Sequence, residues 1–197
     1  MRAKRIFDYC TASLALVLLL PIVATLAILV KLSSPGEVIY RAKRIGRDGR
    51  PFYMYKFRTM ISGADRMGPL VTASNDPRIT VLGYYLRKTK LDELPSLWNV
   101  VIGDMSLVGP RPENGRSVGR YNDAQRWVLK VRPGVTSLAT LKYRNEERLL
   151  AQAENLDSAY HSIMQDKLAL EREYIIRRNF WLDLKILLQT ALAIFHI

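Results

Sequence analysis

The chain has 197 residues, with 30 Lys and Arg against 18 Asp and Glu, which gives a formal net charge of +12. This length suits one domain with its own core, or a smaller domain with a membrane element, and requires no multidomain organisation. The positive charge predicts an anionic partner, which could be nucleic acid, lipid headgroups or a phosphorylated substrate. The single cysteine, Cys10, excludes an intramolecular disulfide and is expected to be a small buried residue.

Residues 9–30 contain no charged side chain. As one straight helix they would reach about 33 Å, which is enough to cross a bilayer. Pro21 lies in the middle of this run and removes a helical hydrogen bond, so a kink or break is expected there. The run is too long for a cleaved signal peptide, and no small-residue cleavage site follows it.

Basic residues flank the run on both sides, within 2–5 and within 31–50. Since positive charges favour the cytoplasmic side, both ends are expected there, as in a re-entrant helix that enters the membrane, breaks at Pro21 and returns. A kinked helix that spans the membrane is the alternative that these residues leave open.

A β-hairpin is predicted from two short β-prone runs, 38–44 and 52–57, joined through an Asp-Gly turn at 46–49. Helices are expected over 81–89 and 92–102.

In the second half of the chain, residues 132–136 (RPGVT) are predicted to form a turn. The charged stretch 145–178 has helical spacing and is expected to form one or two solvated helices. Residues 180–195 are mostly apolar and would either lie on the membrane surface or complete the core. The predicted fold class is therefore α+β and mostly helical.

Asp92 and Glu93 form an acidic pair just after the basic residues Arg87, Lys88 and Lys90. Acidic residues are common in the first turn of a helix, where they cap free N–H groups, and Asp92 is expected at or near the N-cap. The same position would keep a carboxylate ionised, so that it could act as a nucleophile or hold Mg²⁺. The residues alone support both interpretations.

Four cations are candidate phosphate ligands, beginning with Arg87. Arg111 lies between Pro110 and Pro112, which would hold its guanidinium on a stiff loop, although an exposed proline loop is the plain alternative. Lys56 and Arg58 would share one side of a strand, next to aromatic residues. An ordinary amphipathic strand or a surface for single-stranded nucleic acid would explain that pattern equally well.

A series of linked motifs resembles the bacterial sugar transferases, the small monotopic phosphoglycosyl transferases, over nearly the whole chain. In this sequence the motifs are YKFRTM at 55–60, DPRIT at 76–80, LDELP at 91–95, NV at 99–100, GDMSLVGPRP at 103–112, RPGVT at 132–136 and LDLKILLQT at 182–190.

The resemblance implies transfer of a sugar 1-phosphate from a UDP-sugar to polyprenyl (undecaprenyl) phosphate, with release of UMP, at the start of surface glycan assembly. It implies that Asp92 is the nucleophile and that Glu93 is associated with Mg²⁺. Arg87, Arg111, Lys56 and Arg58 remain the candidate phosphate contacts, and Asp92 is a second candidate metal ligand.

The resemblance also favours a re-entrant membrane helix over residues 1–35, broken at Pro21. Residues 36–197 would then form one catalytic domain, with interfacial amphipathic helices, on the cytoplasmic face of a bacterial inner membrane. The expected partners are membrane lipid and the two substrates, with no nucleic acid; the resemblance indicates no oligomeric state.

Two departures from the family pattern matter. Many members have Ser before the helix-breaking proline, where this chain has Leu20. After RPGVT, many members continue with a GLAQVNGR-like run, whereas residues 137–145 here are SLATLKYRN. The sugar therefore cannot be inferred from this loop.

Two other classes of function fit parts of the sequence. A membrane-tethered protein that binds nucleic acid would use the basic surface and the aromatic residues at 53–58. In a membrane scaffold, the acidic pair would only cap a helix.

Overall fold

The computed structural model describes residues 2–64, 67, 76–153 and 155–195. The α-helices are α1 (Arg2–Leu18), α2 (Leu20–Ser33), α3 (Val81–Thr89), α4 (Leu97–Ile102), α5 (Gly115–Gly119), α6 (Leu138–Lys142), α7 (Glu146–Ala151), α8 (Leu156–Arg177) and α9 (Phe180–Phe195). The strands are β1 (Ile39–Ile45), β2 (Pro51–Phe57), β3 (Ser106–Val108) and β4 (Gly134–Thr136), and the 3₁₀ helices are η1 (Arg47–Gly49), η3 (Leu91–Ser96) and η4 (Arg126–Lys130). The predicted α+β class with mostly helical content is confirmed.

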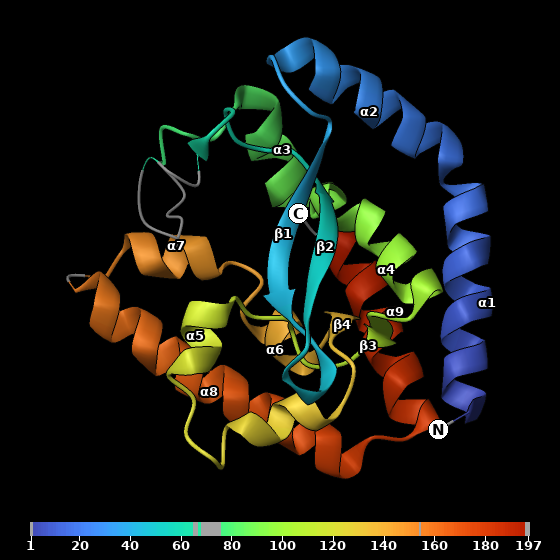
Figure 1. Cartoon of the computed structure of the whole chain (residues 1–197), viewed down its shortest axis with the longest axis vertical. Coiled ribbons are helices and arrows are strands. Elements are labelled where there is room, and N and C mark those ends of the chain that lie inside the picture. The colour runs from blue at the N-terminus through green and yellow to red at the C-terminus, as the bar shows by residue number, and fades with distance from the viewer. Residues whose placement is uncertain (1, 65–66, 68–75, 154, 196–197) are drawn as a thin grey trace.

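The N-terminal segment is a bent pair of helices that runs along the outside of the molecule (Figure 1). α1 and α2 meet at Leu19 with a bend of 63°, and Pro21 lies in the first turn of α2. Proline has no N–H to donate and is tolerated at that position, so the break falls where Pro21 predicts it. No single helix in the described ranges has the length and apolarity to cross a bilayer, but α1 and α2 together meet that test. Cys10 is exposed on α1, so the expectation that it is buried is wrong.

The predicted hairpin is present as the antiparallel pair β1–β2, in which Ala42 lies opposite Met54 and both are buried. Asp48 and Gly49 have φ values of 57° and 76°. A left-handed conformation at both residues suits the Asp-Gly turn that the sequence predicts.

Asn99 joins α4 to the open edge of β2. Its Nδ2 donates to the Tyr53 carbonyl at 2.7 Å, and its Oδ1 accepts from the Tyr55 N–H at 3.0 Å. The amide therefore satisfies the backbone groups that a third strand would have bound. Lys56 is the next residue of β2 after Tyr55, so this contact also fixes where Lys56 lies.

Residues 132–136 were expected to form a turn, and this is wrong, because β4 pairs in parallel with β3. A Cβ on Gly134 would lie 2.1 Å from the Gly109 nitrogen, so the glycine permits a close approach of two backbones. The sequence did not indicate either strand, since three residues are too few for a periodic pattern.

The stretch 145–178 forms two helices, α7 and α8, but α8 is not solvated as predicted. Its buried side chains include apolar residues and also two charged ones: Met164, Lys167, Leu168, Glu171, Tyr174 and Ile175. α9 completes the core through Ile186 and Asp183, while Trp181, Leu184, Leu188 and Leu192 remain exposed. Charged residues on the buried face of α8 hid its amphipathic pattern.

Replacing Asn99 with alanine is expected to lower the free energy of unfolding by roughly 1 to 3 kcal/mol, because it removes two hydrogen bonds that each contribute about 0.5 to 1.5 kcal/mol. Asn99 is fully buried. Denaturant unfolding of the detergent-purified protein measures the loss. The matched control is Asn145→Ala, at an exposed position whose side chain makes no cap hydrogen bond. Equal stability of the two variants would contradict the bridging role of Asn99.

Candidate active site

Asp92 and Glu93 lie in the 3₁₀ helix η3, which follows a sharp reversal of the chain at Lys90. Lys90 has a φ of 61°, and its N–H donates to the Arg87 carbonyl at the end of α3. The predicted helix 92–102 is thus two elements, η3 and α4. Asp92 lies in the first turn of η3, near the N-cap residue Lys90, as predicted, but no side chain makes a capping hydrogen bond there.

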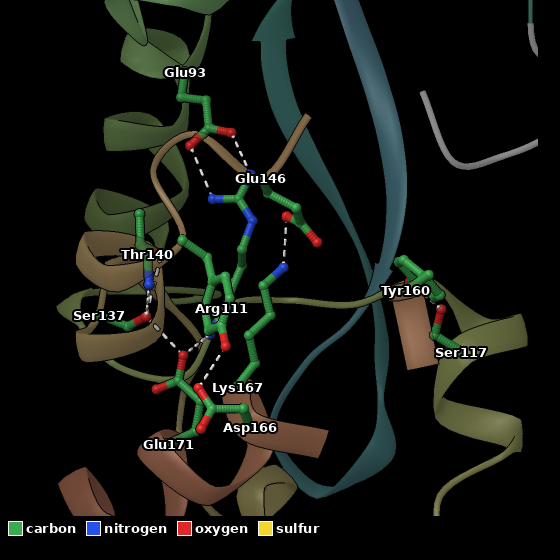
Figure 2. Close-up of polar contacts among 11 residues, drawn as sticks. Glu93, Arg111, Ser117, Ser137, Thr140, Glu146, Tyr160, Asp166, Lys167 and Glu171 are labelled. Carbon is green, nitrogen blue, oxygen red and sulfur yellow. Dashed lines mark hydrogen bonds and ion pairs between the residues drawn. The ribbon is translucent and has the colours of Figure 1, made fainter. Parts of the chain in front are cut away.

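Glu93 is bound by two cations from different elements, Lys56 and Arg111; Figure 2 shows the contact with Arg111. The Lys56 Nζ from β2 lies 2.5 Å from its Oε1, and the Arg111 Nη2 from the loop after β3 lies 2.7 Å from the same atom. Burial alone would raise the pKa of this carboxyl, but the charges of Arg111 and Lys56 outweigh it and hold the pKa well below its usual range. Glu93 is therefore ionised, and it raises the pKa of Arg111 in turn.

Asp92 lies in a different environment from its neighbour. It is 8% exposed, and its Oδ1 is buried with no hydrogen-bond partner among the described residues. Burial, followed by the charge of Glu93, raises its pKa to about 6, against the opposing charges of Lys56, Lys90 and Arg87. Burial thus opposes the ionised form that the sequence predicts for Asp92.

Three of the four predicted phosphate ligands lie at the acidic pair. Lys56 and Arg111 contact Glu93, and the half-buried Arg87 is near enough to lower the pKa of Asp92. Arg58 lies elsewhere: its Nη2 donates to the carbonyl and hydroxyl of Ser34, at 2.6 and 2.9 Å, at the end of α2. Arg58 thus joins the hairpin to the membrane-helix candidate, and a phosphate role for it stays a prediction.

Glu171 on α8 is a site residue that the sequence did not indicate. Its Oε1 accepts from the Ser137 hydroxyl at 2.6 Å and from the Arg111 N–H at 3.3 Å (Figure 2). Burial raises its pKa to about 7. Glu171 is one of many charged residues in its stretch of sequence, so no spacing rule distinguishes it.

Few carboxylate groups at this site are available to bind a metal ion. Within residues 2–64, 67, 76–153 and 155–195, no cluster of three or more His, Cys, Asp or Glu side chains could hold an ion. Glu93 is occupied by Lys56 and Arg111, which leaves the Asp92 carboxylate as the candidate metal ligand. Mg²⁺ commonly takes one or two carboxylates together with substrate phosphates and water. This donor set fits a Mg²⁺ that binds together with a phosphate substrate, and it does not form a closed protein cage.

Asp92→Asn is expected to raise the free energy of unfolding at pH 7 by roughly 2 to 3 kcal/mol in metal-free buffer, since one unit of pKa shift corresponds to about 1.4 kcal/mol. The raised pKa of about 6 means that the folded state keeps this proton longer than the unfolded state, so wild-type stability falls as the pH rises from about 4 to 6. The gain should therefore vanish near pH 3.5. Denaturant unfolding of both proteins from pH 3.5 to 8 tests this, and a gain that does not depend on pH would contradict it.

Comparisons with known sequences identify the family of this chain. Residues 1–197 match the model of the family described as bacterial sugar transferase. The chain is 38% identical to the UDP-glucose:undecaprenyl-phosphate glucose-1-phosphate transferase of Escherichia coli (strain K12) over 193 residues. This match covers 95% of this chain and 39% of that protein. It is 36% identical over 207 residues to the exopolysaccharide production protein ExoY of Rhizobium meliloti (strain 1021), covering 98% of this chain and 85% of that protein.

A further relative is the UDP-N-acetylgalactosamine-undecaprenyl-phosphate N-acetylgalactosaminephosphotransferase of Aeromonas hydrophila, 33% identical over 196 residues, which covers 97% of this chain and 43% of that protein. The chain thus spans about two fifths of the length of the relatives from E. coli and A. hydrophila. The family model covers residues 1–197 and the E. coli and R. meliloti relatives cover 95% and 98% of the chain, so the chain belongs to the bacterial sugar transferase family.

Proposed function

We propose that this chain transfers a sugar 1-phosphate from a UDP-sugar to undecaprenyl phosphate, releases UMP and so starts the assembly of a surface glycan. The observation that carries the proposal is the contrast within the acidic pair: Glu93 is bound by Lys56 and Arg111, whereas the buried Asp92 Oδ1 has no partner in the described part of the chain. The names of the relatives from E. coli and A. hydrophila supply the two substrates.

In the proposed first step, the Asp92 carboxylate attacks the sugar-linked phosphorus of the UDP-sugar. The bond from that phosphorus to the bridging oxygen breaks, UMP leaves with the oxygen, and an acyl phosphate links Asp92 to the sugar. In the second step, an oxygen of undecaprenyl phosphate attacks the same phosphorus, which releases Asp92 and forms a diphosphate-linked sugar. Two successive displacements predict ping-pong kinetics.

The cations around Asp92 support this chemistry. A diphosphate repels a carboxylate, so the phosphoryl oxygens need neutralisation before attack. Arg111, Lys56 and Arg87 are near enough to provide part of it, and bound Mg²⁺ would supply further neutralisation of the phosphates. Asp92 is the residue best placed to hold this metal; Glu93 would first have to exchange one of its cations.

A re-entrant membrane helix is the second part of the proposal, because both ends of the α1–α2 pair are attached to the same domain. At the start of α1, Arg5 donates to the Val101 carbonyl of α4 at 2.8 Å, and Lys4 contacts Asp183 of α9 at 2.6 Å. At the end of α2, Arg58 binds Ser34. The bend between these attachments would then enter the bilayer and leave both ends on the cytoplasmic side of a bacterial inner membrane.

Exposed apolar side chains support this placement. Those on α1 and α2 include Leu14, Val17, Leu18, Leu20, Ile22 and Ile28. α3 and α9 expose Val81, Tyr84, Tyr85, Trp181, Leu184 and Leu188. Tyrosine and tryptophan favour the headgroup region, so α3 and α9 would lie at the membrane interface.

With purified protein, Mg²⁺ and a panel of UDP-sugars, Asp92→Asn is expected to lower UMP release by at least about 10³-fold, because it removes the nucleophile. The control Asp123→Asn changes an exposed carboxylate and should keep full activity. Mass spectrometry of the wild type with donor alone should show a sugar-phosphate adduct on the peptide that contains Asp92. Full activity of Asp92→Asn would remove this residue as the nucleophile.

Cysteine labelling tests the membrane arrangement in a Cys10→Ala background. Arg2→Cys and Lys43→Cys should both resist an impermeant maleimide from outside the inner membrane and both react after the membrane is permeabilised. Leu20→Cys, beside the bend, should react poorly in both conditions, because it would lie in lipid. If only one of the Arg2 and Lys43 positions reacted from outside, the re-entrant arrangement would be wrong and a spanning helix would replace it.

A further inference from the structure

The parallel pairing of β3 and β4 brings two loops together at one edge. Ser106 lies opposite Gly134 and Val108 opposite Thr136, so the chain leaves both strands at their shared carboxyl edge. The first loop leads into Arg111 and the second into Ser137. Glu171, 4% exposed on α8, lies where these loops meet (Figure 2).

The loop that carries Arg111 depends on very few backbone hydrogen bonds. Pro110 and Pro112 have no N–H, so the Arg111 N–H is the only backbone donor in this tripeptide. It donates to the Glu171 Oε1 at 3.3 Å, while the Pro110 carbonyl accepts from the Gly134 N–H at 2.9 Å. The loop is thus held on one side by β4 and on the other by Glu171.

The second loop fixes Glu171 itself. Ser137 caps α6, since its hydroxyl oxygen accepts from the Thr140 N–H at 3.0 Å. The same hydroxyl donates to the Glu171 Oε1 at 2.6 Å. One carboxylate oxygen therefore joins the cap of α6 to the backbone of Arg111.

We infer that Glu171 is a positioning residue for the transfer reaction: by holding the Arg111 backbone through Oε1, it keeps the Arg111 guanidinium on Glu93 and toward the transferred phosphoryl group. The inference rests on the proposed function. The Glu171 Oε2 is buried with no partner in the part of the chain that the structure describes. A buried, half-satisfied carboxylate is often less stabilising than an apolar residue of similar volume, so its presence is better explained by positioning than by stability.

Hydrogen–deuterium exchange tests this inference without reference to activity. Within residues 110–112 only Arg111 has an exchangeable backbone amide, so a peptide that spans them reports on it. Glu171→Leu removes the acceptor and should accelerate exchange of this amide, whereas Glu171→Gln keeps an amide oxygen at the same place and should preserve protection. The control Glu173→Gln changes a more exposed carboxylate on the same helix and should leave the exchange rate unchanged. Unchanged protection in Glu171→Leu would overturn the inference.

A double-mutant cycle then tests whether Glu171 acts through Arg111. Glu171→Leu should lower kcat/KM for UMP release by about 10- to 100-fold, as supporting residues around an active site commonly do. If Glu171 acts only through Arg111, Glu171→Leu should have almost no effect in an Arg111→Ala background, because the two losses are then not additive. Fully additive losses would overturn the inference.

Two further arms separate the possible failures. If Glu171→Leu does not fold, Ser137→Ala replaces it in the same cycle, because it removes the other group that holds the Glu171 carboxylate. If the wild type releases no UMP with any donor, the proposed function fails. The exchange experiment still decides whether Glu171 holds the Arg111 backbone.

Discussion

The Glu93 carboxylate is the point at which three separate parts of the chain meet. Lys56 reaches it from the hairpin and Arg111 from the loop after β3, while Glu93 itself belongs to the short 3₁₀ helix after α3. A buried charge is costly unless opposite charges and hydrogen bonds compensate for it. The loss of either cation would therefore leave the buried Glu93 carboxylate only partly compensated and destabilise the folded state. The surrounding contacts keep these elements in place: Asn99 fixes β2, and Glu171 fixes the loop of Arg111.

The same cluster separates the chemical behaviour of two adjacent carboxylates. Glu93 takes the cations and has its pKa lowered, whereas Asp92 remains without a partner for Oδ1 among the described residues and has its pKa raised. Pairs of acids whose environments push their pKa values apart are common where the two have different roles. In the proposed reaction, Glu93 would organise the cations that neutralise the phosphates, and Asp92 would form the bond to phosphorus. The buried Asp92 carboxylate lowers the stability of the folded protein, which suits a residue that is retained for its reactivity.

Some of this arrangement could be predicted from the sequence, and the reasons are local. The hairpin follows from an Asp-Gly turn between two β-prone runs, and the break in the N-terminal helix follows from Pro21. The resemblance to a known family indicated Asp92 and Glu93, which spacing alone would not separate from a helix cap. The β3–β4 pair escaped prediction because its strands are short and one begins with a glycine that resembles a turn signal. Glu171 escaped because its role arises from burial, which a charged stretch does not reveal.

α1, part of the proposed membrane element, is attached to the strand that leads to Arg111 and so to the Glu93 cluster. Asp8 of α1 accepts from the Ser106 hydroxyl of β3 at 2.6 Å, and Tyr174 of α8 donates to the Val108 carbonyl of the same strand at 3.1 Å. β3 leads directly into the loop that carries Arg111. In the proposed arrangement, the helix that enters the bilayer is thus bonded to the strand that positions a catalytic cation. The depth of the helix in the membrane and the height of the active site above it would then be set together, which suits a reaction whose acceptor phosphate is held at the membrane surface.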